Sequence, residues 1–590
     1  MKQVFERMRR LLPPAVGVAL TASLLLPAQS AQAATLDSFS ADFTLTRVDG
    51  DKSGLIASAE SAGVAKAAVI DVVDPNDSRT GRPTLCHGTG LNGAMKYDGF
   101  CWDKGDDESG YTDPGGGWMP QGFSGSHDAT ADGLYAGRHL YAASWYFGDY
   151  YGKTNQYSRI SIVESTGDRV SYGHVALVEP VNGNFKELTY KSHADGVAWY
   201  GNRLFVANGA ELQVYDLTHL WKMSDTGSSA GETGLRGSGS TMQTSARYHR
   251  WALPLVARYT TLGGVALDAN TRPFPIPKDA NGNCVGDAQD CTKGSPRACG
   301  PKYQSPNDVD VLCLSSLSID RSTSPPSLIS VENYAKDGGR IVRWPLSQLG
   351  ASQPTQVSSY TTGYTTPVYN VQGTATDGVN FYMSGDCPGS WPAGYSCIHV
   401  ASPGGSTRVL SQAPWLTQGL SWDRNVGRLW GLNEALEDPD VGARRVVFSI
   451  DPGAGKEVDG WGWLSNFNKP GFVCATPQGE GTINGTVVTV YHCTGAESQR
   501  WKFENGRLRH KVSDKCLTPR GDAEGTDGAV LTLWTCGSAS SQQFKPDGAT
   551  ITNQLGKAIT PDGNSLADGK WLTLWTNNRA NVQEWSVKGF

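Results

Sequence analysis

The sequence predicts an all-β protein, in which a β-propeller of five to seven blades is followed by a C-terminal β-trefoil. Glycines, tryptophans and tyrosines are abundant while long amphipathic runs are few, which is typical of β-sheets joined by tight turns. Short alternating segments recur through the body, and the C-terminal region contains a threefold repeat. A chain of 590 residues also needs more than one hydrophobic core. We expect a signal peptide at 1–33, the propeller body at 34–460 and the trefoil at 461–590.

The N-terminus has the pattern of a secretory signal peptide. A basic start precedes an apolar stretch from Leu11 to Leu26 and the small residues Ala31-Gln32-Ala33, which predict cleavage after about Ala33. A membrane anchor is the alternative, but the apolar stretch is shorter than the ~20 residues that a span needs. We therefore expect a secreted, extracellular protein, with Sec and twin-arginine export both open.

Charge excludes two classes of partner. The whole chain has a formal charge of -6, and removal of the basic signal makes the charge more negative. An acidic protein lacks the electrostatic attraction that nucleic acids and anionic membranes offer to basic ones. We expect a monomer with no nucleic acid partner and no membrane insertion.

All twelve cysteines follow the predicted cleavage site. An even number in a secreted chain indicates complete disulfide pairing. Proximity in the sequence predicts the pairs Cys86–Cys101, Cys284–Cys291, Cys299–Cys313, Cys387–Cys397, Cys474–Cys493 and Cys516–Cys536. A metal–thiolate site is the alternative, and the sequence contains no Cys-x-x-Cys pair to favour it.

Three segments near the C-terminus repeat one pattern: CATPQG…VVTVYHC…SQRW, CLTPRG…VLTLWTC…SQQF and AITPDG…WLTLWTN…VQEW. Equivalent landmarks such as Cys474 and Cys516 are 42 residues apart. Such a period marks structural units that bury a shared core by packing against each other. The third copy has Ala558 and Asn577 in place of its two cysteines, so packing alone must hold that lobe.

This pattern resembles the ricin B-type β-trefoil lectin module, which also occurs as a carbohydrate-binding module on secreted bacterial glycosidases. The Gln-x-Trp signature of that family matches residues 499–501 and 583–585 and reads Gln-Gln-Phe at 542–544. The resemblance implies a β-trefoil whose signature residues lie mostly in the core, and a glycan or polysaccharide as the partner.

The resemblance also implies where sugars bind and what this chain has lost. Each family site uses an Asp soon after the first Cys, an aromatic residue before the second Cys and an Asn beside the signature Gln. The acidic positions are Thr476, Thr518 and Thr560 here, and the Asn positions are Ser498, Ser541 and Val582. The aromatic positions are kept as Tyr491, Trp534 and Trp575, which are our candidate ligand-binding residues of the trefoil. Hydrogen bonds to charged groups contribute about 1.5–3 kcal/mol against about 1 kcal/mol for neutral ones, so the module either binds a polymer weakly by stacking or has become purely structural.

Residues 34–460 contain a looser repeat, in which a polar residue and a glycine precede an apolar strand, a turn and a second strand. Examples begin at PQGF (120–123), HADGVAW (193–199), VQGTATDG (371–378) and TQGLSWD (417–423). An innermost propeller strand needs glycine where backbones converge at the axis. Outer strands are expected at 159–164, 174–179, 327–333 and 444–451. A β-sandwich or jelly roll is the alternative.

Several segments of the body also resemble a group of secreted actinobacterial proteins of predicted propeller fold and no established activity. These segments are WMPQGF, SHADGVAWYGNRLFVAN, SIDRSTSPPSLISVENY, VQGTATDG and QGLSWD. The resemblance implies a propeller and secretion, and it implies nothing about chemistry.

The polar residues of this repeat predict a ligand site. If the segments are blades, Gln121, His193, Asp195, Gln372 and Gln418 gather at one end of the central channel, where propellers bind small polar ligands. The alternative is that these side chains hydrogen-bond neighbouring strands and close the channel. Six more polar residues either face the same opening or are solvated at the surface: His127, Asp128, Glu332, Arg343, Asp386 and Glu434.

Two enzyme chemistries fit, and the sequence does not decide whether the body is catalytic. A glycosidase needs two carboxylates, for which Asp195 with Glu332 or Glu434 is available. A polysaccharide lyase needs a base such as His193 or a tyrosine, and Arg343 would neutralise the uronate. The candidate catalytic residues are therefore His193, Asp195, Glu332 and Arg343, and the ligand-binding candidates of the body are Gln121, Gln372 and Gln418. The alternative function is a non-catalytic lectin or scaffold whose propeller binds a protein or a small ligand.

The segment KDANGNCVGDAQDC at 278–291 resembles a calcium-binding loop. Positions 1, 3, 5, 9 and 12 of such a loop bear oxygen ligands, and here they are Asp279, Asn281, Asn283, Asp287 and Asp290. Cys284 stands where a glycine makes the sharp turn, and position 12 is Asp rather than Glu, as in thrombospondin type 3 repeats. Calcium is the one cofactor that the sequence predicts, and a turn-rich insertion tied by Cys284 and Cys291 is the alternative.

Overall fold

The computed structural model describes residues 35–91, 95–108, 117–148, 157–188, 192–227, 231–263, 311–333, 339–350, 354–387, 396–434, 444–453, 461–466, 473–493, 496–547, 550–585 and 587. The expected signal peptide at 1–33 lies outside these residues. So does the expected calcium loop with Asp279, Asn281, Asn283, Asp287 and Asp290, which therefore stays a prediction.

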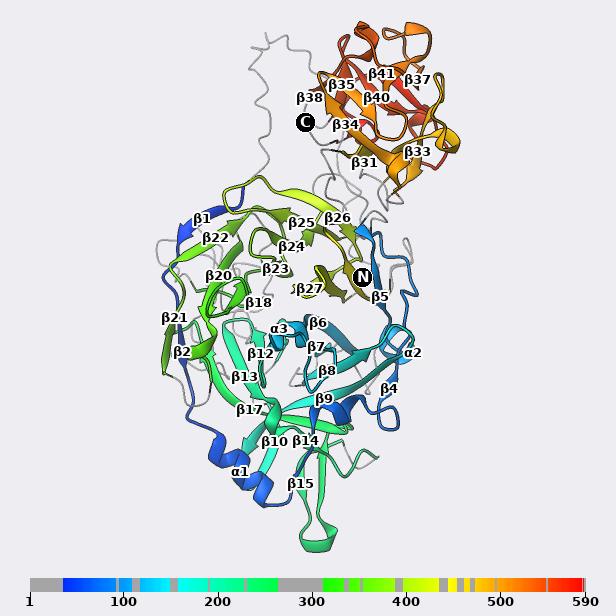
Figure 1. Ribbon diagram of the computed structural model, residues 1–590. Coiled ribbons are helices and arrows are strands. Elements are labelled where there is room, and N and C mark those ends of the chain that lie inside the picture. The colour runs from blue at the N-terminus through cyan, green and yellow to red at the C-terminus, as the bar shows by residue number, and fades with distance from the viewer. Residues whose placement is uncertain are drawn as a thin grey trace, which may run out of the picture. The chain divides into compact units, whose positions relative to one another are not determined.

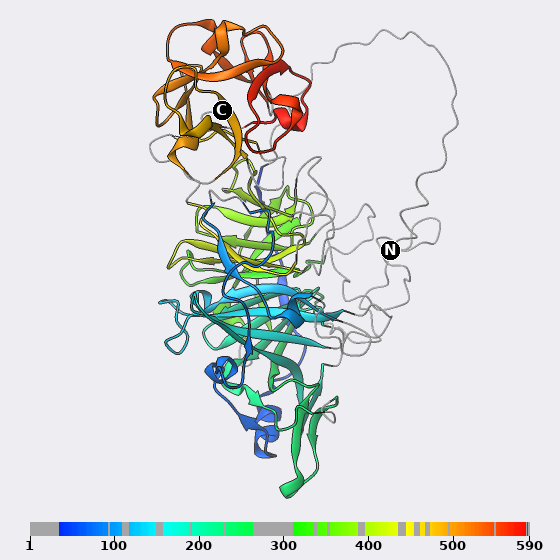
Figure 2. The same ribbon diagram turned by 90° about the vertical axis from the view of Figure 1, so that its right-hand side faces the viewer.

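The body is a five-bladed β-propeller (Figure 1), which confirms the predicted fold class and excludes a sandwich or jelly roll. Each blade begins with an innermost strand, and each innermost strand contacts the next until the ring closes. In ring order these strands are β6 (Gly117–Gly125), β11 (Gly196–Tyr200), β18 (Ser316–Asp320), β23 (Gly373–Thr376) and β27 (Thr417–Asp423). Figure 1 shows the propeller viewed along the axis of its ring, and Figure 2 shows its sheets from the side.

Antiparallel strands follow outward from each innermost strand. Blade 1 continues with β7 (Leu140–Gly148), β8 (Ser158–Ser165) and β9 (Val170–Val181), and blade 2 with β12 (Arg203–Asn208), β13 (Glu211–Asp216) and β17 (Trp251–Thr260). Blade 3 continues with β19 (Ser327–Val331), β20 (Gly339–Pro345) and β22 (Thr362–Thr366), blade 4 with β24 (Phe381–Asp386), β25 (Ser396–Ala401) and β26 (Arg408–Ala413), and blade 5 with β28 (Arg428–Asn433) and β29 (Val447–Ile450). The outer strands of blades 1 and 2 are joined by parallel pairing between β9 and β17.

The N-terminal segment completes several blades. Strand β1 (Asp37–Ser40) forms the outer edge of blade 3 by pairing with β22, and β5 (Asp98–Phe100) forms the outer edge of blade 5 by pairing with β29. Helix α1 (Ser53–Ser61) contacts β9, α2 (Lys104–Glu108) follows β5 in the chain, and α3 (Ser126–Ala129) follows β6 and contacts β11 and β27.

Shorter strands pair with other outer strands or with each other. These strands are β2 (Thr44–Arg47), β3 (Ala65–Lys66), β4 (Arg79–Thr80), β10 (Asn184–Glu187), β14 (Trp221–Lys222), the hairpin of β15 (Thr233–Arg236) and β16 (Gln243–Ala246), and β21 (Gln356–Ser358).

Glycines at the hub let the innermost strands approach closely. A Cβ atom added at any of four glycines would lie between 2.2 and 2.7 Å from a backbone atom of the next innermost strand, closer than real Cβ atoms come. The four are Gly122, Gly196, Gly373 and Gly419. Each is the glycine of a polar–Gly pair in the sequence repeat, so the convergence predicted from that repeat is confirmed.

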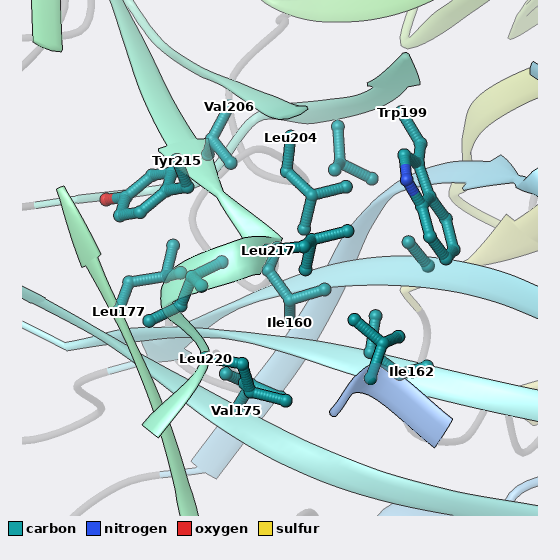
Figure 3. Close-up of a cluster of buried hydrophobic side chains, with 14 of the residues drawn as sticks. Ile160, Ile162, Val175, Leu177, Trp199, Leu204, Val206, Tyr215, Leu217 and Leu220 are labelled. Atoms are coloured by element: carbon teal, nitrogen blue, oxygen red, sulfur yellow. The ribbon is translucent and has the colours of Figure 1, made fainter. Parts of the chain in front are cut away.

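The blades are held together by apolar faces that pack on each other. Figure 3 shows one such contact, in which Ile160 and Leu177 of blade 1 meet Leu204 and Tyr215 of blade 2. All four side chains are at most 3% exposed. Burial of side chains of this size stabilises a fold by about 1.5–3 kcal/mol each, so blade-to-blade packing is a main source of stability.

The C-terminal region is a β-trefoil of three similar lobes. Its strands are β30 (Gly462–Trp463), β31 (Ser465–Asn466), β32 (Val473–Pro477), β33 (Val488–His492), β34 (Arg500–Glu504), β35 (Arg507–His510), β36 (Lys515–Pro519), β37 (Ala529–Thr535), β38 (Phe544–Asp547), β39 (Thr550–Asn553), β40 (Lys557–Pro561) and β41 (Leu572–Thr576). The repeated hairpins pair β32 with β33, β36 with β37 and β40 with β41. Trp501, Phe544 and Trp585 of the signature are buried in the shared core.

Four predicted disulfides are present: Cys86–Cys101, Cys387–Cys397, Cys474–Cys493 and Cys516–Cys536. The pairs Cys284–Cys291 and Cys299–Cys313 include residues outside the described part of the chain. In the third lobe, Ala558 is buried and Asn577 donates hydrogen bonds to Asp547 and Thr550, both at 2.9 Å. Side-chain hydrogen bonds thus stand where the other lobes have a disulfide.

Across the described residues, every helix falls short of the length and apolar character that a membrane span requires.

Candidate functional site

The polar residues of the body repeat lie at one level of the propeller hub. Gln121, Asp195, Gln372 and Gln418 each precede one of the four glycines that touch the next innermost strand. Innermost strands run in the same direction around a propeller, so these residues share the end at which the strands begin. Gln121, Asp195 and Gln418 are buried, whereas Gln372 is partly exposed.

His193 and Asp195 form a hydrogen-bonded pair at the start of β11. His193 Nδ1 lies 2.7 Å from Asp195 Oδ1, and Asp195 Oδ2 accepts a hydrogen bond of 2.9 Å from the backbone N–H of Gly209. The backbone N–H of His193 donates to Asn208 Oδ1 at 2.9 Å, so the end of β12 holds the pair in place. A carboxylate only accepts hydrogen bonds. Nδ1 therefore carries the proton, and Nε2 of neutral His193 has the lone pair.

Side chains from blades 1 and 5 extend this pair. The ring of Tyr146 stacks on His193 with a centroid distance of 3.9 Å, and its hydroxyl donates to Glu434 Oε1 at 2.8 Å. The other carboxylate oxygen of Glu434 accepts a hydrogen bond of 3.0 Å from Gln418 Nε2. Three blades thus bring Asp195, His193, Tyr146, Glu434 and Gln418 into one network.

Such a network can move protons. A neutral histidine held by a carboxylate is a good general base, since the carboxylate fixes its orientation and stabilises the imidazolium that forms. Glu434 adds a second carboxylate, whose two oxygens accept hydrogen bonds from Tyr146 and Gln418. Removal of a proton by a base and its return to the leaving group are what cleavage of a glycosidic bond requires, by hydrolysis or by elimination.

Glu332 and Arg343, the other catalytic candidates, have partners of their own in blade 3. Glu332 is fully buried and accepts hydrogen bonds from Arg340 Nε at 2.6 Å and from Arg340 Nη2 at 2.7 Å. Burial raises the pKa of Glu332, although Arg340 opposes this. Arg343 lies 3.2 Å from Asp320, at the far end of β18. Both side chains therefore serve ion pairs within the blade, and the structure does not bring them together.

The remaining polar candidates are divided between the two ends of the hub. Asp386 ends β24 and accepts a hydrogen bond of 2.6 Å from Asn370 on the surface. His127 and Asp128 lie in α3, which follows the end of β6, so they belong to the end of the hub opposite His193. Tyr146 was missed by sequence reasoning because it is one of several aromatic residues in the strand LYAASWYFG and no pattern distinguishes it.

In the trefoil, the three threonines at the acidic positions are buried and bonded inside the lobes. Each hydroxyl oxygen accepts a hydrogen bond from the signature glutamine of its own lobe, at 3.0–3.1 Å. The pairs are Thr476 with Gln499, Thr518 with Gln542 and Thr560 with Gln583. Threonine at these positions thus bonds to the signature glutamine inside the lobe and carries no charge.

The three aromatic residues of the trefoil are exposed. Tyr491, Trp534 and Trp575 are 40%, 49% and 42% exposed. A loop from a neighbouring lobe supports each one, because its side-chain oxygen accepts a hydrogen bond from the backbone N–H of the residue after the ring, at 2.7–3.0 Å. The loop residues are Asp568, Asn484 and Asp527, respectively. The module therefore presents three ring faces to solvent in a threefold arrangement.

Comparison with known proteins assigns the C-terminal region. Residues 461–585 match the ricin-type beta-trefoil lectin domain family, which confirms the resemblance seen in the sequence. A segment of 44 residues is 41% identical to the probable lipoprotein EnvE of Salmonella typhimurium. That match covers 8% of this chain and 25% of the relative, so the chain spans about a quarter of that protein's length.

Solved structures are similar to parts of the chain. The C-terminal half of an earthworm R-type lectin, in complex with GalNAc, is 11% identical over 22% of this chain and 96% of its own, with a TM-score of 0.19. The β-trefoil lectin of the Vibrio vulnificus hemolysin/cytolysin is 23% identical over 20% and 84%, with a TM-score of 0.17. An exo-beta-1,3-galactanase from Clostridium thermocellum is 12% identical over 76% and 93%, with a TM-score of 0.24.

Proposed function

We propose that this is a secreted carbohydrate-binding protein whose trefoil holds a polysaccharide by stacking. The observation that carries the proposal is the set of three exposed rings, Tyr491, Trp534 and Trp575, at equivalent positions of a lectin-type domain. Four disulfides among the described residues support an extracellular location, because disulfides persist in oxidising compartments.

The absence of an acidic residue at Thr476, Thr518 and Thr560 favours a polymer over a free sugar as the ligand. Without a charged acceptor, each sugar site relies on stacking and on neutral hydrogen bonds, which contribute about 1 kcal/mol each. One such site is too weak to hold a monosaccharide. Three sites on a rigid scaffold gain avidity when a single chain or a polymer surface engages more than one of them.

The test is co-sedimentation of the full-length protein with a panel of insoluble polysaccharides. Each of Tyr491→Ala, Trp534→Ala and Trp575→Ala should weaken retention several-fold, and the triple variant should abolish it. Trp571→Ala is the matched control, since Trp571 is also 40% exposed on the trefoil but lies outside the repeated position. Equal retention of the triple variant and the wild type would refute stacking by these rings, and a lack of retention on every polymer would identify a trefoil that is purely structural.

We further propose that the propeller cleaves the polysaccharide that the trefoil holds. The supporting observation is the pair His193–Asp195, linked through the ring of Tyr146 to Glu434. In this proposal His193 Nε2 takes a proton from the substrate or from water. The imidazolium that forms, held by Asp195, then returns this proton to the leaving oxygen as the glycosidic bond breaks.

Product chemistry distinguishes hydrolysis from elimination. Hydrolysis releases reducing ends only, whereas a lyase also produces an unsaturated uronate with ultraviolet absorbance. We expect His193→Gln to reduce either product by at least 100-fold, the scale of general acid–base catalysis, with polymer retention unchanged. His219→Gln is the control, because His219 also pairs with a carboxylate, Glu60, at 2.7 Å but lies away from the hub. If the wild type shortens no polymer that it retains, the protein is the non-catalytic lectin or scaffold.

A further inference from the structure

A second cluster of polar groups lies at the opposite end of the hub, where the innermost strands end. His127 in α3 follows β6, His139 precedes β7, and Asp423 is the last residue of β27. His127 Nδ1 lies 3.6 Å and His139 Nε2 lies 3.1 Å from the same atom, Asp423 Oδ2. One potential ligand atom from each residue falls within 4.8 Å of the others. The cluster therefore joins blade 1 to blade 5.

The bonding of His127 leaves one of its nitrogens unused. Ser421 donates its only hydroxyl proton to Asp128 Oδ2 at 2.6 Å, so its oxygen accepts a hydrogen bond from His127 Nε2–H, at 2.7 Å. In the neutral ring, Nδ1 then carries a lone pair. Nδ1 has no hydrogen-bond partner within the described part of the chain, although the side chain is fully buried. A buried nitrogen without a hydrogen bond destabilises the folded state, which indicates that Nδ1 has a ligand.

The surroundings of His127 are those of a metal-bound histidine. Such a ring normally donates its second N–H to a carboxylate, a backbone carbonyl or a water, which fixes the ring and its tautomer. Here the hydroxyl of Ser421 takes that place and is itself bonded to Asp128, to which Ser124 donates a further hydrogen bond at 2.8 Å.

We propose that His127 Nδ1, His139 Nε2 and Asp423 Oδ2 bind a divalent transition-metal ion of the zinc type. Bonds of about 2.0–2.2 Å in a tetrahedral site place neighbouring ligand atoms roughly 3.3–3.5 Å apart, close to the 3.1 and 3.6 Å found here. Two imidazole nitrogens and one carboxylate oxygen suit zinc, cobalt or nickel better than calcium or magnesium. The side chain of His139 is 32% exposed, which leaves the ion a route from solvent.

This site differs from the predicted calcium loop and from the proposed acid–base network. Its ligands come from β27 and from the segments next to β6 and β7, at the end of the hub away from His193. The only other cluster of this kind within the described residues, Cys86, His87 and Cys101, has both sulfurs committed to a disulfide. A bound ion would crosslink the first and last blades and so stabilise the closed ring.

The test uses tag-free, full-length protein stripped with a chelator and then titrated with Zn²⁺ or Co²⁺ alone. Calorimetry and metal analysis should show one zinc bound per chain in the presence of excess calcium. Co²⁺ should give the intense visible bands of a tetrahedral site with nitrogen ligands. The propeller should also unfold at a higher temperature when zinc is present.

His139→Gln and Asp423→Asn should each weaken zinc binding by at least tenfold and remove the thermal shift. His139→Gln carries the test, since a partly exposed residue is replaced with little risk to folding, whereas His127 is buried. His219→Gln is the matched control, because the side chain of His219 is 30% exposed and is bonded to a carboxylate, and it should bind zinc as the wild type does. Absence of stoichiometric zinc binding, or equal affinity in the His139→Gln variant, overturns the proposal.

Discussion

Individual histidines of the propeller are buried as neutral groups. Burial lowers the pKa of His399 to about 4, and His174 reaches a similar value. His399 lies in β25 of blade 4, and its Nε2 donates a hydrogen bond of 2.8 Å to the backbone oxygen of Asp386. Unfolding returns such a ring to a pKa near 6.5, so the unfolded chain binds a proton that the folded chain does not.

His399→Gln is therefore expected to reduce the loss of stability in mild acid. Between pH 4 and 6.5 the unfolded state binds more protons, so the free energy of unfolding falls as the pH falls. For His399 alone the loss between pH 7 and pH 5 is about 2 kcal/mol. Chemical unfolding of the propeller at pH 7, 6 and 5 measures the slope, which should be smaller in the variant because glutamine keeps the N–H donor and does not titrate. Parallel slopes for the two proteins would contradict this account.

For individual residues, the sequence shows which side chains lie at the propeller hub, but it does not show which of them bond to each other. Gln121, Asp195, Gln372 and Gln418 were predictable, since only glycine fits where innermost strands touch and each of these residues precedes such a glycine. The bond between Tyr146 and Glu434 joins residues 288 apart. Only the order of the blades around the ring brings them together, and no local pattern carries that information.

Among the elements, alternating patterns located strands well. The outer strands expected at 159–164 and 174–179 lie within β8 and β9. The number of blades was not predictable, because the third blade begins with Ser316 and Leu317 rather than a polar–Gly pair. Its outer edge is also β1, which comes from the start of the chain.

The third trefoil lobe should accept the disulfide that the other two lobes have. Ala558 pairs with Trp575 in the same register in which Cys516 pairs with Trp534, and Asn577 stands at the position of the second cysteine. Closing a loop of this size stabilises by about 3 kcal/mol, less about 2 kcal/mol for the two lost hydrogen bonds of Asn577. The double variant Ala558→Cys, Asn577→Cys should thus raise the free energy of unfolding of the trefoil by about 1 kcal/mol. Chemical unfolding with and without reductant measures the gain, and equal stability in both conditions, or free thiols in the oxidised protein, would show that the lobe does not accommodate the bond.

For the whole molecule, ring closure depends on a segment far away in the sequence. Phe100 of β5 pairs with Val447 of β29, and its ring lies among aromatic residues of blades 1 and 5 that include Tyr141 and Trp430. Arg428 adds an ion pair of 2.9 Å with Asp98. The disulfide Cys86–Cys101 anchors the same segment. Strand β5, which precedes the first blade in the sequence, thus completes the last blade.

Gly99→Ala should open that closure. A Cβ at Gly99 would lie 2.1 Å from the backbone oxygen of Val447 and 2.8 Å from Phe448 Cα, so β5 cannot keep its place on β29. We expect the free energy of unfolding of the propeller to fall by about 2–4 kcal/mol, with the unfolding of the trefoil unchanged. Calorimetry of the full-length protein separates the two transitions. Gly54→Ala is the control from the same N-terminal segment, because a Cβ at Gly54 in α1 meets no atom within 4 Å. If both substitutions leave the propeller transition where it is in the wild type, pairing of β5 with β29 is not what holds the ring closed.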